Sequence, residues 1–282
     1  DVKLYKGGIP AQYGGRASSI LDVKMKEGNS KKLEVNGGIG VIFSRFSIEA
    51  PIIKDKASFI FAARRSYIDI LAKPFLTGNN ANASFNFYDL TAKVNYNINA
   101  KNTVFLSGYF GRDVFGTSFG FNWGNGTISS RWNHVFSEKL FMNATAFYSN
   151  YDYLLDSDIE NKRPNDSFKW SSNIENLSIK PDFTYYVNPT NTISFGGQIL
   201  SYEFKPGKAI ATSTGEKREF GQANKKGTES SAYISQELKI SPVFSVQYGM
   251  RYSYYDYKSL NGEYYDRVKV PISTENASGY IL

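Results

Sequence analysis

Apolar and polar side chains alternate over several long stretches of this chain, and this period of two constrains the fold most. From Tyr88 to Ile98 the even-numbered residues are Tyr, Leu, Ala, Val, Tyr and Ile, whereas Asp, Thr, Lys, Asn and Asn fill the odd positions. Residues 177–187 and 244–254 show the same division. Successive side chains of a strand point to opposite faces, so each stretch predicts a β-strand with one apolar and one wet face. A helix, with about 3.6 residues per turn, would mix the two sets.

Connections between these stretches alternate between short and long. Outer-membrane barrels place short turns on the periplasmic side and long loops outside, whereas a soluble sandwich has no reason to alternate in this way. Short turns occur at 54–56, 99–102, 137–139, 188–191 and 241–242, and long polar segments at 73–86, 113–126, 152–172, 205–228 and from Asp256 onward. We therefore predict an all-β fold, an antiparallel up-and-down transmembrane β-barrel. Its strands are expected to begin near Leu33, Ala57, Tyr88, Thr103, Thr127, Leu140, Asn173, Thr192, Glu229 and Val243.

The alternation also predicts which side chains face lipid. Lys or Arg on the lipid face at mid-bilayer costs about 2–4 kcal/mol, whereas a lumen can hydrate the charge. We expect Leu90, Val94, Tyr96, Ile179, Phe183, Val246, Tyr248 and Met250 to face lipid, and Lys93, Lys180, Asp182, Gln247 and Arg251 to face the lumen. Aromatic residues beside the long connections fit an interfacial girdle, with ordinary packing in a β core as the alternative. They are Tyr67, Tyr109, Phe110, Tyr148, Tyr151, Tyr153, Tyr202, Phe204, Tyr254 and Tyr255.

Composition and charge narrow the class further. The chain of 282 residues is 16% aromatic and contains no cysteine, which removes disulfides, thiolate metal sites and Cys nucleophiles. No run approaches the roughly 18 apolar residues of a membrane-spanning helix. The net charge of +7 is spread among acids with no nucleic-acid-binding module, so no nucleic acid is expected, whereas lipopolysaccharide phosphates stay open as partners. The chain begins at Asp1 without an initiator Met or signal peptide, so we expect a processed form or a fragment.

Residues 1–28 do not follow the strand-and-turn pattern. We expect a short strand from Val2 to Tyr5 and another from Ile20 to Met25, joined by a compact, turn-rich element. Glycines at 7, 8, 14 and 15 suit a positive φ or a close approach of backbone, and Pro10 fixes a turn.

This segment resembles the end of the plug domain of TonB-dependent outer-membrane receptors. The matching residues are Lys6-Gly7-Gly8, Pro10-Ala11, Tyr13-Gly14-Gly15-Arg16, Ser18-Ser19, Asp22-Val23 and Lys26-Glu27-Gly28. The resemblance implies that 1–30 is the end of a plug domain and 31–282 the N-terminal portion of a barrel of about 22 strands that encloses it. Two open sheet edges would each leave unpaired backbone groups in hydrocarbon, so further strands are expected to close the barrel.

By the same resemblance, the protein imports a bulky nutrient such as a siderophore, glycan or peptide across the bacterial outer membrane. Its partners would be outer-membrane lipid and lipopolysaccharide, the nutrient ligand, and a TonB-type energy-coupling protein that acts through an upstream segment absent from this sequence. A lipoprotein partner stays an open alternative. Arg16 is expected to bond lumenal acids such as Glu34 or Glu49, or plug carbonyls, because polar contacts hold a plug and still let it move.

Other chemistry is sparse in the sequence. His134 is the only histidine, so neither a metal site nor a cofactor is expected, and no catalytic constellation is visible. Arg112, Trp123 and Trp170 lie in segments expected to be loops and are candidate ligand contacts, since loops on a rigid scaffold commonly carry recognition. An outer-membrane barrel enzyme with a Ser-His-acid site and a surface ligand-binding β protein are the alternative functions.

Overall fold

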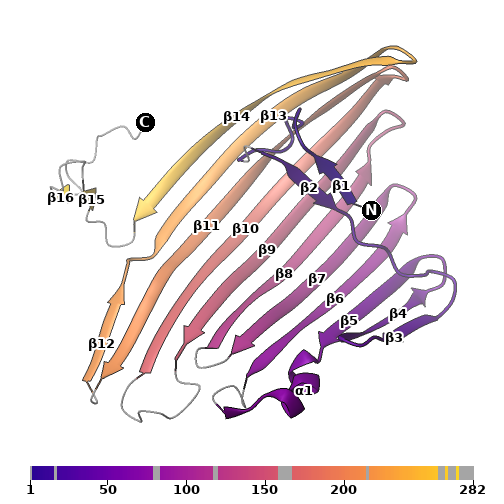
Figure 1. The fold of residues 1–282 in the computed structure, drawn as a ribbon. Coiled ribbons are helices and arrows are strands. Elements are labelled where there is room, and N and C mark those ends of the chain that lie inside the picture. The colour runs from indigo at the N-terminus through magenta and orange to yellow at the C-terminus, as the bar shows by residue number, and fades with distance from the viewer. Residues whose placement is uncertain are drawn as a thin grey trace.

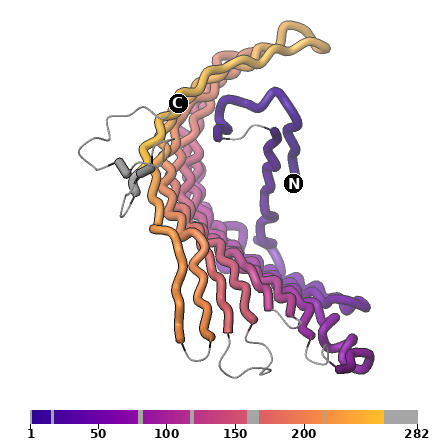
Figure 2. Tube along the Cα trace, turned by 60° about the vertical axis from the view of Figure 1, so that its left-hand side comes forward, coloured from indigo at the N-terminus to yellow at the C-terminus, as the bar shows by residue number. Residues whose placement is uncertain are grey.

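The computed structural model describes residues 2–15, 18–78, 83–116, 120–157, 167–213, 216–259, 264–265 and 271–272. Most of them form one long, curved antiparallel sheet, and the N-terminal segment lies on its concave side (Figures 1 and 2). The described residues contain no helix long and apolar enough to cross a membrane. The predicted all-β, up-and-down fold is confirmed.

Strands follow one another in the sheet in chain order, as hairpin connections require. The sheet runs through β3 (Glu34–Ile39), β4 (Phe43–Ile53), β5 (Ala57–Ser66), β6 (Ser84–Asn99), β7 (Asn102–Gly116), β8 (Gly120–Val135), β9 (Leu140–Asp156), β10 (Ser167–Asn188), β11 (Asn191–Ser213), β13 (Lys225–Ser241) and β14 (Phe244–Ser259), while β12 (Glu216–Gly221) pairs with the end of β11. Separate pairs are β1 (Val2–Tyr5) with β2 (Ile20–Val23), and β15 (Tyr264–Tyr265) with β16 (Pro271–Ile272). A short helix α1 (Ile68–Ala72) and a 3-10 turn η1 (Lys73–Phe75) join β5 to β6.

The predicted strand starting near Leu33 is wrong in one respect, because the structure divides it into β3 and β4. A tight turn at residues 40–42 separates them, closed by a hydrogen bond from Gly40 N to Phe43 O at 2.9 Å. A Cβ on residue 40 would come within 3.1 Å of that carbonyl oxygen, so glycine suits the turn. The short turns predicted between the other strands are present, for example at 54–56.

The long connections are largely strands rather than loops, which corrects the prediction. β7 and β8 pair from Asn102↔His134 to Gly116↔Gly120, and β11 contains 23 residues. A transmembrane strand needs only about 9–11 residues, so β10 and β11 extend well past the thickness of a bilayer. In water the backbone ladder needs no apolar outer face, and the outward residues of the β10 extension are polar, namely Ser167, Lys169, Ser171 and Asn173. A polar composition predicts a loop, but it is equally compatible with a strand that projects into water.

Contacts with the N-terminal segment define the inner face of the sheet. Lys93 Nζ donates to Met25 O at 3.1 Å, Arg251 Nη1 donates to Gln12 O at 3.3 Å, and Lys180 Nζ lies 5.2 Å from the centre of the Tyr13 ring. Cross-strand partners share a face, so the alternate residues form the outer face. The predicted division of lumenal and lipid-facing side chains is therefore confirmed as inner and outer, with outward Met250 among the most exposed at 74%.

Aromatic side chains edge the apolar band of the outer face at both ends. On β6, Tyr88 and Tyr96 are eight residues apart, which is about 27 Å of strand and close to the height of a membrane band when tilt is included. The predicted girdle was only partly right. Phe110, Tyr148 and Tyr254 do face outward, but the register turns others inward, namely Tyr109, Tyr151, Tyr153, Tyr202, Phe204 and Tyr255. Adjacent residues of a strand cannot both face lipid.

Candidate functional site

The N-terminal segment is a small hairpin whose two strands agree with the sequence prediction. β1 and β2 pair antiparallel from Val2↔Val23 to Tyr5↔Ile20. The connection contains a turn closed by Tyr13 N donating to Pro10 O at 2.9 Å. Gly8 and Gly15 have φ of 55° and 68°, the left-handed region that glycine enters without a Cβ penalty. The motif glycines therefore have a conformational role at two positions, while no atom lies within 4 Å of a Cβ built on Gly7.

Just beyond the hairpin, residues 25–28 are held by three neighbouring strands, β4, β5 and β6. Lys26 Nζ lies 2.6 Å from Glu49 Oε1, Lys93 Nζ lies 3.7 Å from Glu27 Oε1, and Ser58 Oγ donates to Gly28 O at 2.8 Å. We call this set, together with the bond from Lys93 to Met25 O, the entry clamp. Its charges are complementary, since each partner meets an opposite charge or a carbonyl oxygen.

The charged wall residues of the entry clamp are buried and therefore need partners. Glu49 is 3% exposed and Lys93 is 5% exposed, whereas the Lys26 side chain is 68% exposed. Within the described ranges, Lys26 is the only cation in ion-pair distance of Glu49. A buried carboxylate needs such a partner, because an unpaired charge in a desolvated site is costly.

Gly28 lies so close to the backbone of β5 that no residue with a Cβ would fit at this position. A Cβ built on it would come within 2.1 Å of the backbone oxygen of Phe59. Because the obstacle is backbone paired within β5, it cannot move aside as a side chain would. The glycine that ends the motif is thus required by contact between two backbones.

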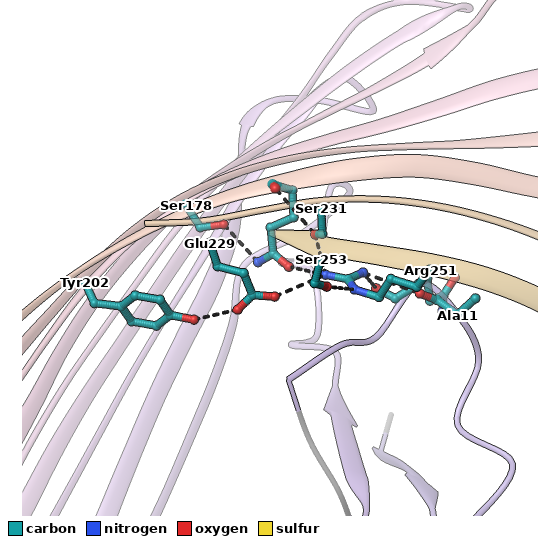
Figure 3. Close-up of polar contacts among 9 residues, drawn as sticks. Ala11, Ser178, Tyr202, Glu229, Ser231, Arg251 and Ser253 are labelled. Atoms are coloured by element: carbon teal, nitrogen blue, oxygen red, sulfur yellow. Dashed lines mark hydrogen bonds and ion pairs between the residues drawn. The ribbon is translucent and has the colours of Figure 1, made fainter. Parts of the chain in front are cut away.

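A second contact joins residues 11–14 to β14 through Arg251. Its Nη1 donates to Ala11 O at 3.4 Å and to Gln12 O at 3.3 Å, and a Cβ on Gly14 would lie 2.1 Å from Nε. Figure 3 shows the same guanidinium held by the wall, where Nη2 donates to Ser231 Oγ at 2.5 Å and lies 3.8 Å from Glu229 Oε1. We call Arg251 and its wall partners the arginine network. Further members are Gln198, Ser253, Tyr202 and Ser178.

Tyr13 lies between the hairpin and β10. Its hydroxyl donates to Asp22 Oδ2 at 3.4 Å, and its ring packs 5.5 Å from that of Tyr5. Partial burial raises the pKa of Tyr13 to about 12, so the phenol is neutral at physiological pH. Lys180, which covers the ring, also has an acidic partner on the wall, Asp182 at 3.4 Å.

Arg16 lies outside the described residues, so its predicted bonds stay a prediction. The acids proposed as its partners have other contacts: Glu49 binds Lys26, and Glu34 accepts from Asn29 at 2.9 Å and pairs with Lys32. The sequence does not predict the entry clamp or the arginine network as groups that hold the N-terminal segment, although it places Lys93 and Arg251 on the inner face. The feature of the sequence that could have indicated them is a cation on the inner face of a strand with alternating polarity.

The candidate ligand contacts lie in strands, and they do not share one site. Trp123 in β8 packs on the inner face against Phe121, with ring centres 4.8 Å apart. Trp170 in β10 is paired opposite Leu155 and also points inward, so the two tryptophans lie on the same face of the sheet as the hairpin. Arg112 in β7 faces outward instead, where Nη2 lies 2.9 Å from Asp152 Oδ1.

A polar groove of about 1030 Å³ lies on the outer face, at the end of the sheet away from the short turns. Its cations are paired, Lys208 with Glu219 at 2.6 Å and Lys205 with Glu175. The hydrogen bond from Lys208 lowers the pKa of the Glu219 carboxyl. The groove is lined by residues that include Asp152, Asn173, Lys205, Lys208, Glu219 and Asn224. In the described part of the chain no His, Cys, Asp and Glu gather as a metal site.

Comparison with known proteins identifies solved structures that share this fold. No protein-family model and no curated protein sequence matches the chain. The copper transporter OprC superimposes with a TM-score of 0.70 at 12% identity, over 91% of this chain and 42% of that one. The pyoverdine receptor FpvA from Pseudomonas aeruginosa superimposes with a TM-score of 0.69 at 11% identity, over 92% of this chain and 46% of that one. The siderophore receptor PirA from Acinetobacter baumannii superimposes with a TM-score of 0.62 at 14% identity, over 92% of this chain and 44% of that one.

OprC and FpvA are TonB-dependent receptors, and the chain has the fold of part of such a receptor. It spans less than half the length of these structures. At such low identity the likeness concerns the fold. The resemblance recognised in the N-terminal motif and the architecture of the sheet therefore agree.

Proposed function

We propose that this chain is part of an outer-membrane, TonB-dependent transporter that imports a bulky nutrient through energy-coupled movement of a plug. In this proposal residues 1–30 end the plug and residues 31–282 begin the barrel. The observation that carries it is the position of the N-terminal hairpin on the concave face of the sheet (Figure 2). Polar contacts hold the N-terminal segment there rather than a hydrophobic interface. Polar contacts can be exchanged with water during movement without exposing much apolar area.

A plugged barrel cannot conduct by diffusion, so transport needs an energy-linked conformational step. We infer that a TonB-type protein supplies it, pulling on a segment upstream of the plug end. Copper and siderophores, named for the structural neighbours, are the first substrates to test. The inward Trp123 and Trp170 are proposed ligand contacts because they lie on the same concave face of the sheet as the hairpin.

The outer face suits the membrane partners of this function. The apolar band between the aromatic girdles fits lipid, and the polar groove beyond it fits saccharide and phosphate groups of lipopolysaccharide. Arg112 lies on this face and is proposed as a contact for such an outer partner rather than for the nutrient. A lipoprotein partner has no specific support from the described surface.

The test is uptake of radiolabelled copper and ferric siderophores by cells that carry the complete receptor, with and without the inner-membrane energising protein. Surface binding is measured in parallel. Binding that persists while uptake stops in the absence of the energising protein supports the proposal. Unchanged uptake would show a passive pore, and a protein that turns over a bound compound would point to the barrel-enzyme alternative.

A further inference from the structure

The arginine network and the entry clamp differ in how many partners their wall residues lose when the N-terminal segment is released. At the arginine network, the segment contributes only the backbone oxygens of Ala11 and Gln12 to the charged group. Arg251 keeps Ser231 at 2.5 Å, Ser253 at 3.3 Å and Glu229 at 3.8 Å when those oxygens leave. Nη1 loses both of its acceptors, but the guanidinium keeps its ion pair and its other hydrogen bonds to the wall through Nε and Nη2.

Lys180 shows the same property beneath Tyr13. Its ammonium is 3.4 Å from Oδ2 of the Asp182 carboxylate. The other oxygen of that carboxylate, Oδ1, accepts a hydrogen bond from the Tyr233 hydroxyl at 2.6 Å. Departure of the Tyr13 ring removes a cation–π contact and leaves the ion pair intact. The wall formed by β10, β11, β13 and β14 thus keeps both ion pairs, Arg251–Glu229 and Lys180–Asp182, without residues 11–14.

The entry clamp has the opposite property. Removal of residues 25–28 takes from Glu49 its cation Lys26, and from Lys93 both Met25 O and Glu27. In the docked state Glu49 and Lys93 are nearly fully buried, and among the described residues neither forms a further ion pair. Within that part of the chain Lys93 keeps only a contact of 5.1 Å with the centre of the Phe105 ring. Release here breaks two ion pairs, Lys26–Glu49 and Glu27–Lys93, and takes from each wall charge the oppositely charged partner that it has in the docked state.

Steric fit points the same way. Gly14 packs against the side chain of Arg251, which can swing aside, whereas Gly28 packs against the backbone of Phe59, which cannot. The contact at residues 11–14 can be broken and remade by rotamer changes, while that at 25–28 needs two backbones to separate and return in register.

Building on the proposed function, we propose that the hairpin of β1 and β2 swings away from the β10–β14 wall during transport while residues 25–28 stay fixed as its pivot. Glu49, Ser58 and Lys93 are positioning residues that hold the pivot, and Arg251 is the release contact. The passage opens between the hairpin and the arginine network, so Gln198, Glu229 and Ser231 give the path a polar wall. A hydrophilic substrate is favoured there.

Cysteine labelling tests this directly, because the 282-residue chain has no cysteine of its own. Two reporters are placed in the complete receptor, Gln12→Cys at the release contact and Met25→Cys at the pivot. Both residues bond the wall through backbone oxygen, so each substitution keeps its contact. Maleimide labelling is measured in cells with and without the energising protein, alongside uptake of the labelled substrate.

We expect energisation to raise the labelling rate of Gln12→Cys several-fold and to leave that of Met25→Cys unchanged. An equal rise at both positions, or a rise at Met25→Cys alone, would overturn the pivot. No change at either position while uptake still requires the energising protein would also overturn it. Uptake that does not require that protein instead refutes the proposed function, whatever the labels do.

A second measurement needs no energisation. Arg251→Ala should raise the resting labelling rate of Gln12→Cys several-fold, and Arg251→Lys, which keeps the charge, should raise it less. Glu49→Gln is the matched variant, expected to increase labelling at Met25→Cys but not at Gln12→Cys. If Arg251→Ala leaves Gln12→Cys unchanged in a receptor that reaches the surface, Arg251 is not the release contact.

Discussion

At the scale of single residues, contact with backbone distinguishes the glycines of the N-terminal motif. Gly28→Ala should weaken docking of the N-terminal segment by about 1–3 kcal/mol, because the added Cβ meets the oxygen of Phe59 at 2.1 Å. Gly7→Ala, where no atom lies within 4 Å of the added Cβ, should cost less than about 0.5 kcal/mol. The measurement is the urea concentration at which the segment becomes protease-sensitive. Equal shifts for the two variants would show that residue 28 does not touch the wall as described.

Tyr13 gives the docked segment a pH dependence. Burial raises its pKa from 10.0 to about 12, so above pH 10 a released phenol ionises before a docked one. The contribution is fully present below pH 10 and is lost as the pH rises toward 12. We expect the phenolate absorbance of the receptor minus that of Tyr13→Phe to titrate near pH 12. A midpoint near 10 would mean that the ring is solvated.

At the scale of one strand, the two faces of β14 should respond differently to the same new charge. Met250→Lys places an ammonium on the outer face and should destabilise the folded barrel in lipid vesicles by about 2–4 kcal/mol. Gln247→Lys places it on the inner face opposite Glu237 and should be nearly neutral. Urea unfolding in vesicles compares them. A larger cost for Gln247→Lys would reverse the register of β14.

At the scale of the whole molecule, the described sheet has two edges, β3 and β14, each with one paired neighbour in the described ranges. Unpaired backbone groups in hydrocarbon cost several kcal/mol each. Residues 1–282 expressed alone should therefore associate edge to edge in vesicles, whereas the complete receptor should be monomeric with respect to these edges. Cross-linking followed by size analysis measures this, and a monomeric, protease-resistant fragment would contradict it.

The sequence by itself determined the all-β, up-and-down class of the fold, the faces of the alternating strands and the resemblance of the N-terminal motif. Alternation of side chains is local, so Lys93 and Val94 could be assigned to opposite faces without knowledge of any neighbour. The motif glycines likewise reported local backbone needs, such as the positive φ of Gly8 and Gly15.

Only the tertiary structure decided which inward groups meet the N-terminal segment. Arg251 bonds Ala11 across 240 residues of sequence, and Lys93 bonds Met25 across 68, so no local pattern could pair them. The extent of the strands was also a tertiary matter, because the segments that contain Trp123 and Trp170 become strands by pairing with segments distant in the sequence, Trp123 with Tyr153 and Trp170 with Ala209. Backbone hydrogen bonds hold such strands outside the membrane, and side-chain polarity alone does not reveal them.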